Sequence, residues 1–167
     1  MDSLDFKYLS HIINALEKFY QNDYDLILSG RHTHEQTISF RIAMYLAEQL
    51  ESIDDKHYVD CEYHGDIYNP ARRKIINGQK IRPDIIYHDR DVQNIFCIEM
   101  KIGSMTQHDY DKINGLISDY GYSEGYCIHN VGRRFVTVNA ISSEHTERGI
   151  RYRFKYCASK NSLEQTI

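Results

Sequence analysis

The stretch from Ile81 to Gly103 constrains the fold most strongly, because it predicts two neighbouring strands. Residues 81–88 and 94–102 have the length and composition of strands, and a short charged turn separates them. The second run is almost wholly apolar apart from Glu99 and Lys101. Side chains alternate between the two faces of a strand, so these two charged side chains point to the same side.

Charged groups inside an apolar strand are costly to bury unless a partner compensates them. Asp84, on the preceding strand, is the expected neighbour of Glu99. Two carboxylates that converge repel each other unless a cation joins them. Mg²⁺ is commonly bound through one or two carboxylates and several waters, and Lys101 is placed to orient such a water or help to deprotonate it. The pattern indicates a metal-dependent phosphodiesterase, and the alternative is a structural ion pair between Glu99 and Lys101.

The first part of the chain predicts two amphipathic helices that pack on this core. Apolar residues recur at helical spacing over 4–20 and again from Thr33 to about Glu51. Thr33, followed three residues later by Gln36, has the pattern of a capping box. The residues between the two helices, 22–32, are expected to form a loop.

Glu35 lies at the head of the apolar stripe of the second helix, three and seven residues before Ile38 and Ile42. This position should face the sheet, which would make Glu35 a third acidic group beside Asp84 and Glu99. The alternative is an acidic residue in a first helical turn, which the helix dipole favours. A zinc-protease helix is excluded, because position 38 is not the histidine that H-E-x-x-H requires.

A basic segment precedes the Asp84 strand. It follows a predicted strand over 58–64 and contains Asn77-Gly78, a strong hairpin signal. Beside an acidic metal site such a hairpin could hold a phosphate backbone, whereas the alternative is a solvated turn. Its candidate phosphate contacts are Arg72, Arg73 and Lys74.

A second basic segment is the predicted strand over 150–157, which alternates strictly between apolar and basic residues. Arg151 and Arg153 lie on its basic face and could contact successive phosphates. The alternative is the ordinary polar face of a half-buried sheet. The net charge of −4 argues against a strong nucleic-acid binder, but the charge is unevenly distributed along the chain. The tail after residue 158 is expected to fray.

Residues 106–120 predict a third helix, which Gly121 should end. Asp109 and Lys112 are three residues apart and are expected to pair on its surface. Two further strands are expected over 124–129 and 133–139.

Length and composition fit a single cytoplasmic domain. A chain of 167 residues has the size of one domain. No apolar run approaches the ~20 residues of a membrane span, and the N-terminus lacks the features of a secretory signal. The cysteines lack zinc-finger spacing, so they are expected to be reduced, buried thiols. They are Cys61, Cys97, Cys127 and Cys157.

The sequence contains Pro83-Asp84 and, after fourteen further residues, Glu99-Met100-Lys101. This pattern resembles the motif of the PD-(D/E)XK nuclease superfamily. Further segments resemble a group of small bacterial members over residues 30–120. They are R-H-T-H-E-Q-T-I-S-F-R-I-A-M-Y-L, V-D-C-E-Y-H, R-P-D-I-I-Y-H, I-E-M-K-I and D-Y-D-K-I. The chain departs from those members at His64-Gly65, where they have Asn-Arg, and at Ile102, where a second lysine is common.

The resemblance implies an α/β fold with a restriction-endonuclease-like αβββαβ core, in which helices flank a central mixed β-sheet. Residues 1–167 would then form one nuclease-like domain. Its parts would be an N-terminal helix and loop (1–30), the core (31–140) and the C-terminal basic strand (150–157).

The resemblance also implies a function, the hydrolysis of DNA phosphodiester bonds by a metal-activated water. Mg²⁺ or Mn²⁺ would be bound by the acidic residues, with the backbone carbonyl of Met100 as a further ligand and Lys101 positioning the nucleophile. Lys112 matches a helix lysine of the family and would contact nucleic acid. The implied catalytic residues are Glu35, Asp84, Glu99 and Lys101.

Two other functions are compatible with the sequence. The chain could be a catalytically inactive scaffold or a nucleic-acid-binding subunit of a larger complex, with a homodimer or another protein as partner. It could also be a zinc hydrolase that uses His32, His34 or His64, although these histidines lack ligand spacing on one element. No membrane partner is expected.

Overall fold

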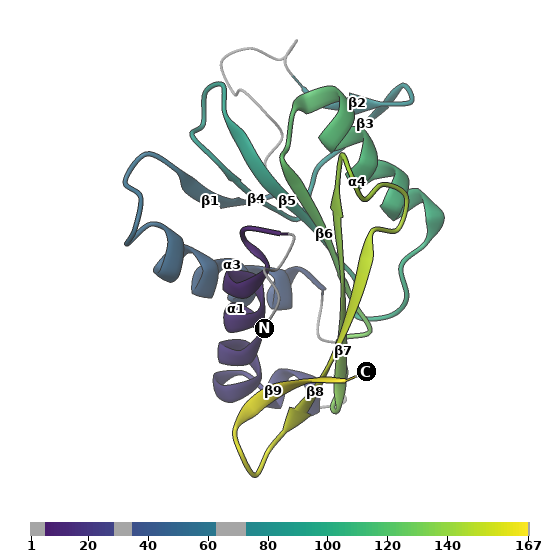
Figure 1. The fold of residues 1–167 in the computed structure, drawn as a ribbon. Helices are drawn as coiled ribbons and strands as arrows, with labels where there is room; N and C mark the ends of the chain where they lie inside the picture. The colour runs from purple at the N-terminus through teal and green to yellow at the C-terminus, as the bar shows by residue number, and fades with distance from the viewer. Residues whose placement is uncertain (1–5, 29–34, 63–72, 167) are drawn as a thin grey trace.

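A mixed, seven-stranded β-sheet forms the centre of the computed structural model, which describes residues 6–28, 35–62 and 73–166. Helices cover both faces of this sheet, α1 and α3 on one side and α4 on the other (Figure 1). The helices are α1 (Leu9–Asn22), α2 (Asp25–Leu28), α3 (Glu35–Leu50) and α4 (Gln107–Tyr120). The prediction of an α/β fold with a central mixed sheet flanked by helices is therefore confirmed.

The strands follow the order β1-β4-β5-β6-β7-β8-β9 across the sheet. Among the described strands of this sheet, only β5 and β6 run parallel, and the chain crosses between them through α4; the other neighbouring pairs are antiparallel. The strands are β1 (Tyr58–Cys61), β4 (Ile85–His88), β5 (Asn94–Met100), β6 (Glu124–His129), β7 (Phe135–Ser142), β8 (Ile150–Cys157) and β9 (Ser162–Thr166). A separate hairpin consists of β2 (Ile75–Ile76) and β3 (Gln79–Lys80), as Asn77-Gly78 predicted.

Strand β5 is buried on both faces, which explains its nearly unbroken apolar sequence. Phe96 and Ile98 pack towards α1 and α3, whereas Cys97 packs towards α4. Each fully buried apolar side chain of this size contributes about 1.5–3 kcal/mol relative to exposure. Glu99, in the same row as Cys97, consequently lies in the α4-side layer, where a carboxylate needs compensating contacts.

Helix α1 confirms the first predicted helix, although its first helical residue is Leu9 rather than residue 4. Most of its apolar stripe is buried in the main core, and Ile13 is half-buried. The predicted loop that follows is partly wrong, because Asp25–Leu28 form the short helix α2. Helix α3 begins at Glu35 in the described residues, and the capping box predicted at Thr33 lies outside them.

Helix α4 confirms the third predicted helix together with both of its ends. The Thr106 side chain accepts a hydrogen bond from the Asp109 N–H, and the Asp109 side chain accepts one from the Thr106 N–H. Gly121 ends the helix in the left-handed conformation, with φ of 69°.

The C-terminal tail is an ordered edge strand, so the prediction that it frays is wrong. Strand β9 pairs with β8, and the N–H of Leu163 donates to Glu17 Oε2 at 2.7 Å. Leu163 also packs against the main core. The predicted strand over 150–157 is confirmed, with its apolar side chains on the core and its basic side chains exposed.

All four cysteines are free, but only Cys97 and Cys127 are buried as predicted. Cys61 is exposed and Cys157 is half-buried, because both lie near the ends of outer strands. Within residues 6–28, 35–62 and 73–166, no helix has both the length and the apolar character needed to cross a membrane.

Candidate active site

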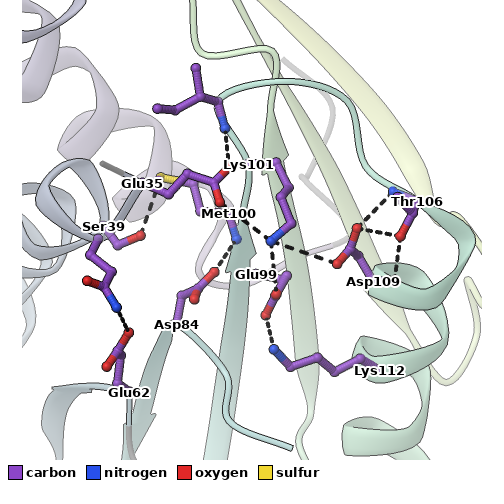
Figure 2. Close-up of polar contacts among 12 residues, drawn as sticks. Glu35, Ser39, Glu62, Asp84, Glu99, Met100, Lys101, Thr106, Asp109 and Lys112 are labelled. Carbon is purple, nitrogen blue, oxygen red and sulfur yellow. Dashed lines mark hydrogen bonds and ion pairs between the residues drawn. The ribbon is translucent and has the colours of Figure 1, made fainter. Parts of the chain in front are cut away.

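The four predicted catalytic side chains lie together at the C-terminal end of β5 (Figure 2). Glu99 is on β5, Lys101 follows it directly after the strand ends, and Asp84 immediately precedes β4. Glu35 is the first residue of α3, on the opposite face, but its carboxylate reaches the end of β5. Segments distant in the sequence therefore place three carboxylates and one ammonium in one cluster.

The register of β4 and β5 brings Asp84 opposite Glu99. Ile85 pairs with Ile98 in this antiparallel ladder, and the Asp84 N–H donates to the Ile98 carbonyl at 3.1 Å. The next positions outward are Asp84 and Glu99, and alternation turns both side chains towards α4. The β4–β5 register therefore places Asp84 beside Glu99, as the spacing of the two residues in the sequence predicted.

Burial shifts the pKa values of this carboxylate pair. Glu99 is only 4% exposed. Burial, reinforced by repulsion from Asp84, raises the pKa of Glu99 to about 7. Burial likewise raises the pKa of Asp84, although the Met100 N–H donates to Asp84 Oδ2 at 2.7 Å and opposes the shift. The two acidic groups are therefore held close together at a cost that a cation would relieve.

Lys101 lies among three carboxylates. Its Nζ is 3.6 Å from Glu35 Oε1, 3.7 Å from Glu99 Oε1 and 4.0 Å from Asp109 Oδ1. Partial burial disfavours the ammonium, but these carboxylates outweigh it and raise the pKa of Lys101 above its usual value. Lys101 is consequently a persistent cation, suited to orienting a water or stabilising negative charge rather than accepting a proton.

Glu35 is anchored to the strand end as well as to Lys101. Its Oε2 accepts a hydrogen bond from the Ile102 N–H at 2.9 Å, while its side chain remains 41% exposed. The prediction that Glu35 faces the sheet is confirmed in this sense. Met100 contributes its N–H to Asp84, and its side chain is buried beside the Ser39 hydroxyl, which lies 3.7 Å from the Met100 sulfur. The proposed ligand role of the Met100 carbonyl stays a prediction.

Helix α4 supplies two site residues, and the surface pair predicted between them is wrong. Lys112 donates to Glu99 Oε2, and its side chain is only 11% exposed. Asp109 accepts from the Thr106 N–H and hydroxyl at 2.8 and 2.7 Å while facing Lys101. Burial alone would raise the pKa of Asp109, but the hydrogen bonds from Thr106 and the nearby lysines outweigh burial and lower that pKa. Sequence reasoning missed Asp109, although the pattern Thr106-x-x-Asp109 marks a capping carboxylate.

Glu62 extends the polar cluster on the β1 side, and sequence reasoning gave it no role. Its N–H donates to the Asp84 carbonyl at 2.9 Å, and its Oε1 accepts from Gln36 Nε2 at 2.7 Å. Arg82 lies 3.3 Å from the other carboxylate oxygen. Glu62 therefore helps to hold the segments that bear Asp84 and the start of α3.

The donor chemistry of this cluster fits a hard divalent cation. Asp84, Glu99 and Glu35 offer carboxylate oxygens, the ligands that Mg²⁺ and Mn²⁺ prefer. Lys112 and Lys101 already neutralise the charge of Glu99. In the present arrangement of the described residues, no group of three acidic, histidine or cysteine side chains is placed to hold a metal ion. An entering cation must therefore displace at least the Lys112 ammonium from Glu99.

The residues predicted to contact phosphate occupy different environments. Arg73 is exposed, whereas Lys74 is only 6% exposed and its ammonium lies 5.3 Å from the centre of the Tyr122 ring. The hairpin packs Lys74 inward against Tyr122, so Lys74 does not fit the phosphate contact predicted for it. Lys112 is likewise occupied with Glu99 rather than exposed to a backbone. Arg72 lies outside the described residues.

Arg151 and Arg153 are exposed on the face of the sheet that also bears Glu99. The Arg153 guanidinium stacks on the Phe135 ring at 4.2 Å. The histidines of the zinc-hydrolase alternative all lie outside the described residues. They are His32, His34 and His64.

Comparisons with known proteins support the fold. No family model matches the sequence, and no curated protein matches it. Among solved structures, a chain of the DrdV–DNA complex, determined by cryo-electron microscopy, superposes with a TM-score of 0.52 at 17% identity. The match covers 83% of this chain and 12% of that one. The comparison shows that the two share a fold over a small part of the larger chain.

Proposed function

We propose that this chain is a metal-dependent nuclease that hydrolyses phosphodiester bonds of DNA, with a restriction-endonuclease-like αβββαβ core. The observation that carries the proposal is the convergence of half-buried Asp84 and buried Glu99 beside the cationic Lys101. Two carboxylates placed opposite each other in the sheet repel, and a bound divalent cation would relieve that repulsion. The choice of DNA is supported by the PD-(D/E)XK-like motif and by the fold shared with a chain of a DNA complex.

Asp84 and Glu99 would hold Mg²⁺ or Mn²⁺, with the Met100 carbonyl and Glu35 completing the ligands directly or through water. When bound, such an ion supplies Lewis-acid polarisation of a phosphoryl oxygen and a more acidic water. The Met100 N–H fixes one oxygen of Asp84, so the carboxylate has a defined orientation before any ion arrives. Glu99 lies on β5, and the burial of this strand on both faces keeps the site rigid.

Lys101 would position the attacking water and stabilise the negative charge that develops on the phosphoryl group. Glu35 and Asp109 hold the ammonium from two sides, and Asp109 is itself fixed by Thr106 at the start of α4. Asp109 is therefore a positioning residue. Lys112 neutralises Glu99 in the ion-free protein and has to release it when the cation binds.

The direct test is cleavage of linear, circular, single-stranded and branched DNA in Mg²⁺, Mn²⁺ or EDTA. Native protein should cleave at least one of these substrates only with a divalent ion. Lys101→Ala and Glu99→Gln should lose this activity, because they remove the charge stabiliser and a metal ligand. Lys56→Ala is the matched lysine control, since Lys56 is exposed near the opposite end of the strands. Cleavage in EDTA, or undiminished cleavage by Lys101→Ala, contradicts the mechanism.

A non-catalytic scaffold is the second candidate, favoured by the ion pairs that already satisfy Glu99. A scaffold needs those pairs intact and predicts no cation binding at Asp84 and Glu99. Under that reading Glu99→Gln would alter assembly or stability while DNA remains uncleaved by every variant. The homodimer or protein partner and the cytoplasmic location stay predictions from the sequence.

A further inference from the structure

A polar cleft adjoins the candidate active site, between the start of α4, the end of β6 and the loop that leads into β8. Its volume is about 400 Å³. We infer that this cleft binds a second backbone phosphate of the DNA strand whose scissile phosphate lies at Glu99; the choice of strand and substrate rests on the proposed function. Its polar lining consists of Ser104, His129, Asn130, Asn139, Arg148 and Arg151.

The cleft is continuous with the site through the segment that follows Lys101. The Asn130 N–H donates to the Gly103 carbonyl at 2.8 Å, and the Ser104 hydroxyl lies 3.4 Å from Asn130 Oδ1. Tyr110, which lines the cleft, directly follows Asp109, which faces Lys101. The same loop and helix turn therefore form the border between the cleft and the catalytic cluster.

Arg148 and Arg151 give the cleft its charge. Both are exposed, and no carboxylate of the described residues lies within ion-pair distance of either guanidinium. Arg148 lies over the Tyr110 ring at 5.5 Å. Guanidinium groups suit phosphate oxygens through paired, charge-assisted hydrogen bonds. At the far end of the same basic row, Lys155 lies opposite Glu164 in the register of β8 and β9, and Glu164 forms its ion pair with Lys160.

The floor of the cleft is a buried network that holds the arginine-bearing loop. Asn139 Oδ1 lies 2.9 Å from His129 Nε2 and accepts from the Tyr110 hydroxyl at 3.4 Å. Asn139 Nδ2 donates to the Arg148 carbonyl at 2.8 Å. A satisfied polar network of this kind fixes one arrangement of the loop. The Arg148 side chain is exposed, and its Nη2 donates to Gln107 Oε1 at 3.3 Å, a neutral contact that a phosphate would replace with a charged one.

Gly149 fixes the chain between the two arginines. Its φ of 61° lies in the left-handed region, and a Cβ atom there would stand 2.0 Å from the Ala140 carbonyl oxygen. Only glycine fits this close approach. The sequence Arg148-Gly149-Ile150-Arg151 is consequently held against β7, with one arginine on each side of the tight contact.

The register of the sheet gives the distance from the cleft to the active site. Glu99 pairs with Cys127, and Cys127 pairs with Asn139. Asn139 in turn pairs with Arg151, so a single row across the α4 face connects Glu99 to Arg151. Three strand spacings of about 4.8 Å give ~14 Å. A phosphate bound at Arg151 would therefore belong to a nucleotide only a few positions along the strand from the scissile phosphate.

The test measures DNA binding in EDTA, so that it is independent of cleavage. Labelled single strands and duplexes are titrated by fluorescence anisotropy with native protein, Arg148→Gln and Arg151→Gln. Each variant should bind about tenfold or more weakly. The slope of log affinity against log salt should fall by about 0.9 per lost phosphate contact on duplex DNA and about 0.7 on single strands. Lys56→Gln, which removes the same charge near the opposite end of the strands, should behave as native. Circular dichroism confirms that each variant is folded.

Oligonucleotide length and free phosphate distinguish the possible occupants. Single strands too short to extend over ~14 Å should bind native protein and Arg151→Gln equally, because they cannot span both positions. Inorganic phosphate and mononucleotides should compete poorly. Strong competition by either would mean that the cleft takes free phosphate and would overturn the strand assignment.

The remaining outcomes separate this inference from the proposed nuclease function. If native protein cleaves DNA with Mg²⁺ but Arg148→Gln and Arg151→Gln bind like Lys56→Gln, the cleft assignment fails and the nuclease stands. If no cleavage occurs but both arginine variants lose affinity, the phosphate cleft stands and the nuclease fails. If native protein binds no DNA in EDTA at any length, the cleft assignment is wrong.

Discussion

Replacing Lys112 by methionine isolates the effect of the ammonium that neutralises Glu99. Methionine keeps much of the length of the side chain and its packing against the helix, but it removes the charge. In the ion-free protein the change leaves Glu99 beside Asp84 with Lys101 as its only near cation among the described residues. We expect loss of stability at alkaline pH and stronger stabilisation by Mg²⁺.

The magnitude follows from the burial of the pair. The Glu99 and Lys112 side chains are 5% and 11% exposed, so solvent screens their interaction little. Removing one partner of a buried ion pair costs about 3–5 kcal/mol. For a domain of this size such a loss lowers Tm by about 6–20 °C. At pH values well below 7 Glu99 is protonated in the native protein, so the cost of Lys112→Met should shrink there.

The assay is thermal unfolding followed by circular dichroism, at mildly acidic and mildly alkaline pH, with and without Mg²⁺. Lys18→Met is the matched control, because the Lys18–Glu48 pair is exposed and should contribute no more than ~1 kcal/mol at either pH. Added Mg²⁺ should raise the Tm of Lys112→Met more than that of native protein, since the ion no longer competes with the ammonium. Equal Tm values for Lys112→Met and Lys18→Met at alkaline pH, with equal responses to Mg²⁺, would refute this reasoning.

Three further changes have defined outcomes. The pKa of Glu99 is raised by burial in the folded protein from 4.5 to about 7, so its contribution to stability should increase as pH falls through 7 towards 4.5, by up to about 3 kcal/mol. Glu99→Gln should flatten this part of the profile, measured by urea unfolding across that range. Thr106→Ala should lose about 1 kcal/mol of helix capping and release Asp109, which lowers both Tm and kcat of any cleavage. Gly149→Ala should destabilise the chain by more than ~1 kcal/mol because of its contact with the Ala140 carbonyl, measured by the same unfolding assay.

The sequence was most informative where local pattern and burial agree. Glu99 and Lys101 interrupt an apolar run at alternate positions, and this identified both the central strand and its charged face. Helix α4 was equally well marked, since its stripe, its start and Gly121 all belong to one short segment. Glu35 was placed towards the sheet because it continues the apolar stripe of α3.

The sequence was least informative where the partner of a side chain comes from another element. Asp109 and Lys112 were predicted to pair with each other, but in the fold they reach Lys101 and Glu99 instead. Helical spacing shows which residues are neighbours and does not show which strand lies beside them. The burial of Lys74 could not be predicted for the same reason, because its partner, the Tyr122 ring, lies far along the chain.

The C-terminal tail shows the same limit for strands. Its polar, turn-like sequence gave no strand signal, yet β9 forms because β8 offers an open edge and Leu163 reaches the core. The local sequence pattern also did not predict the cleft that contains Arg148. It depends on the alignment of four strands in register, which places Arg151 in the row of Glu99.

The most direct test of the central claim is Mn²⁺ binding followed by electron paramagnetic resonance on native protein, Asp84→Asn and Glu99→Gln. Glu164→Gln is the control, because Glu164 is a carboxylate on β9 that pairs with Lys160. We predict a single bound Mn²⁺ in native protein and in Glu164→Gln, and a large loss of affinity in each active-site variant. Unchanged Mn²⁺ binding in Asp84→Asn and Glu99→Gln, or no Mn²⁺ binding by native protein with DNA present, would contradict the account.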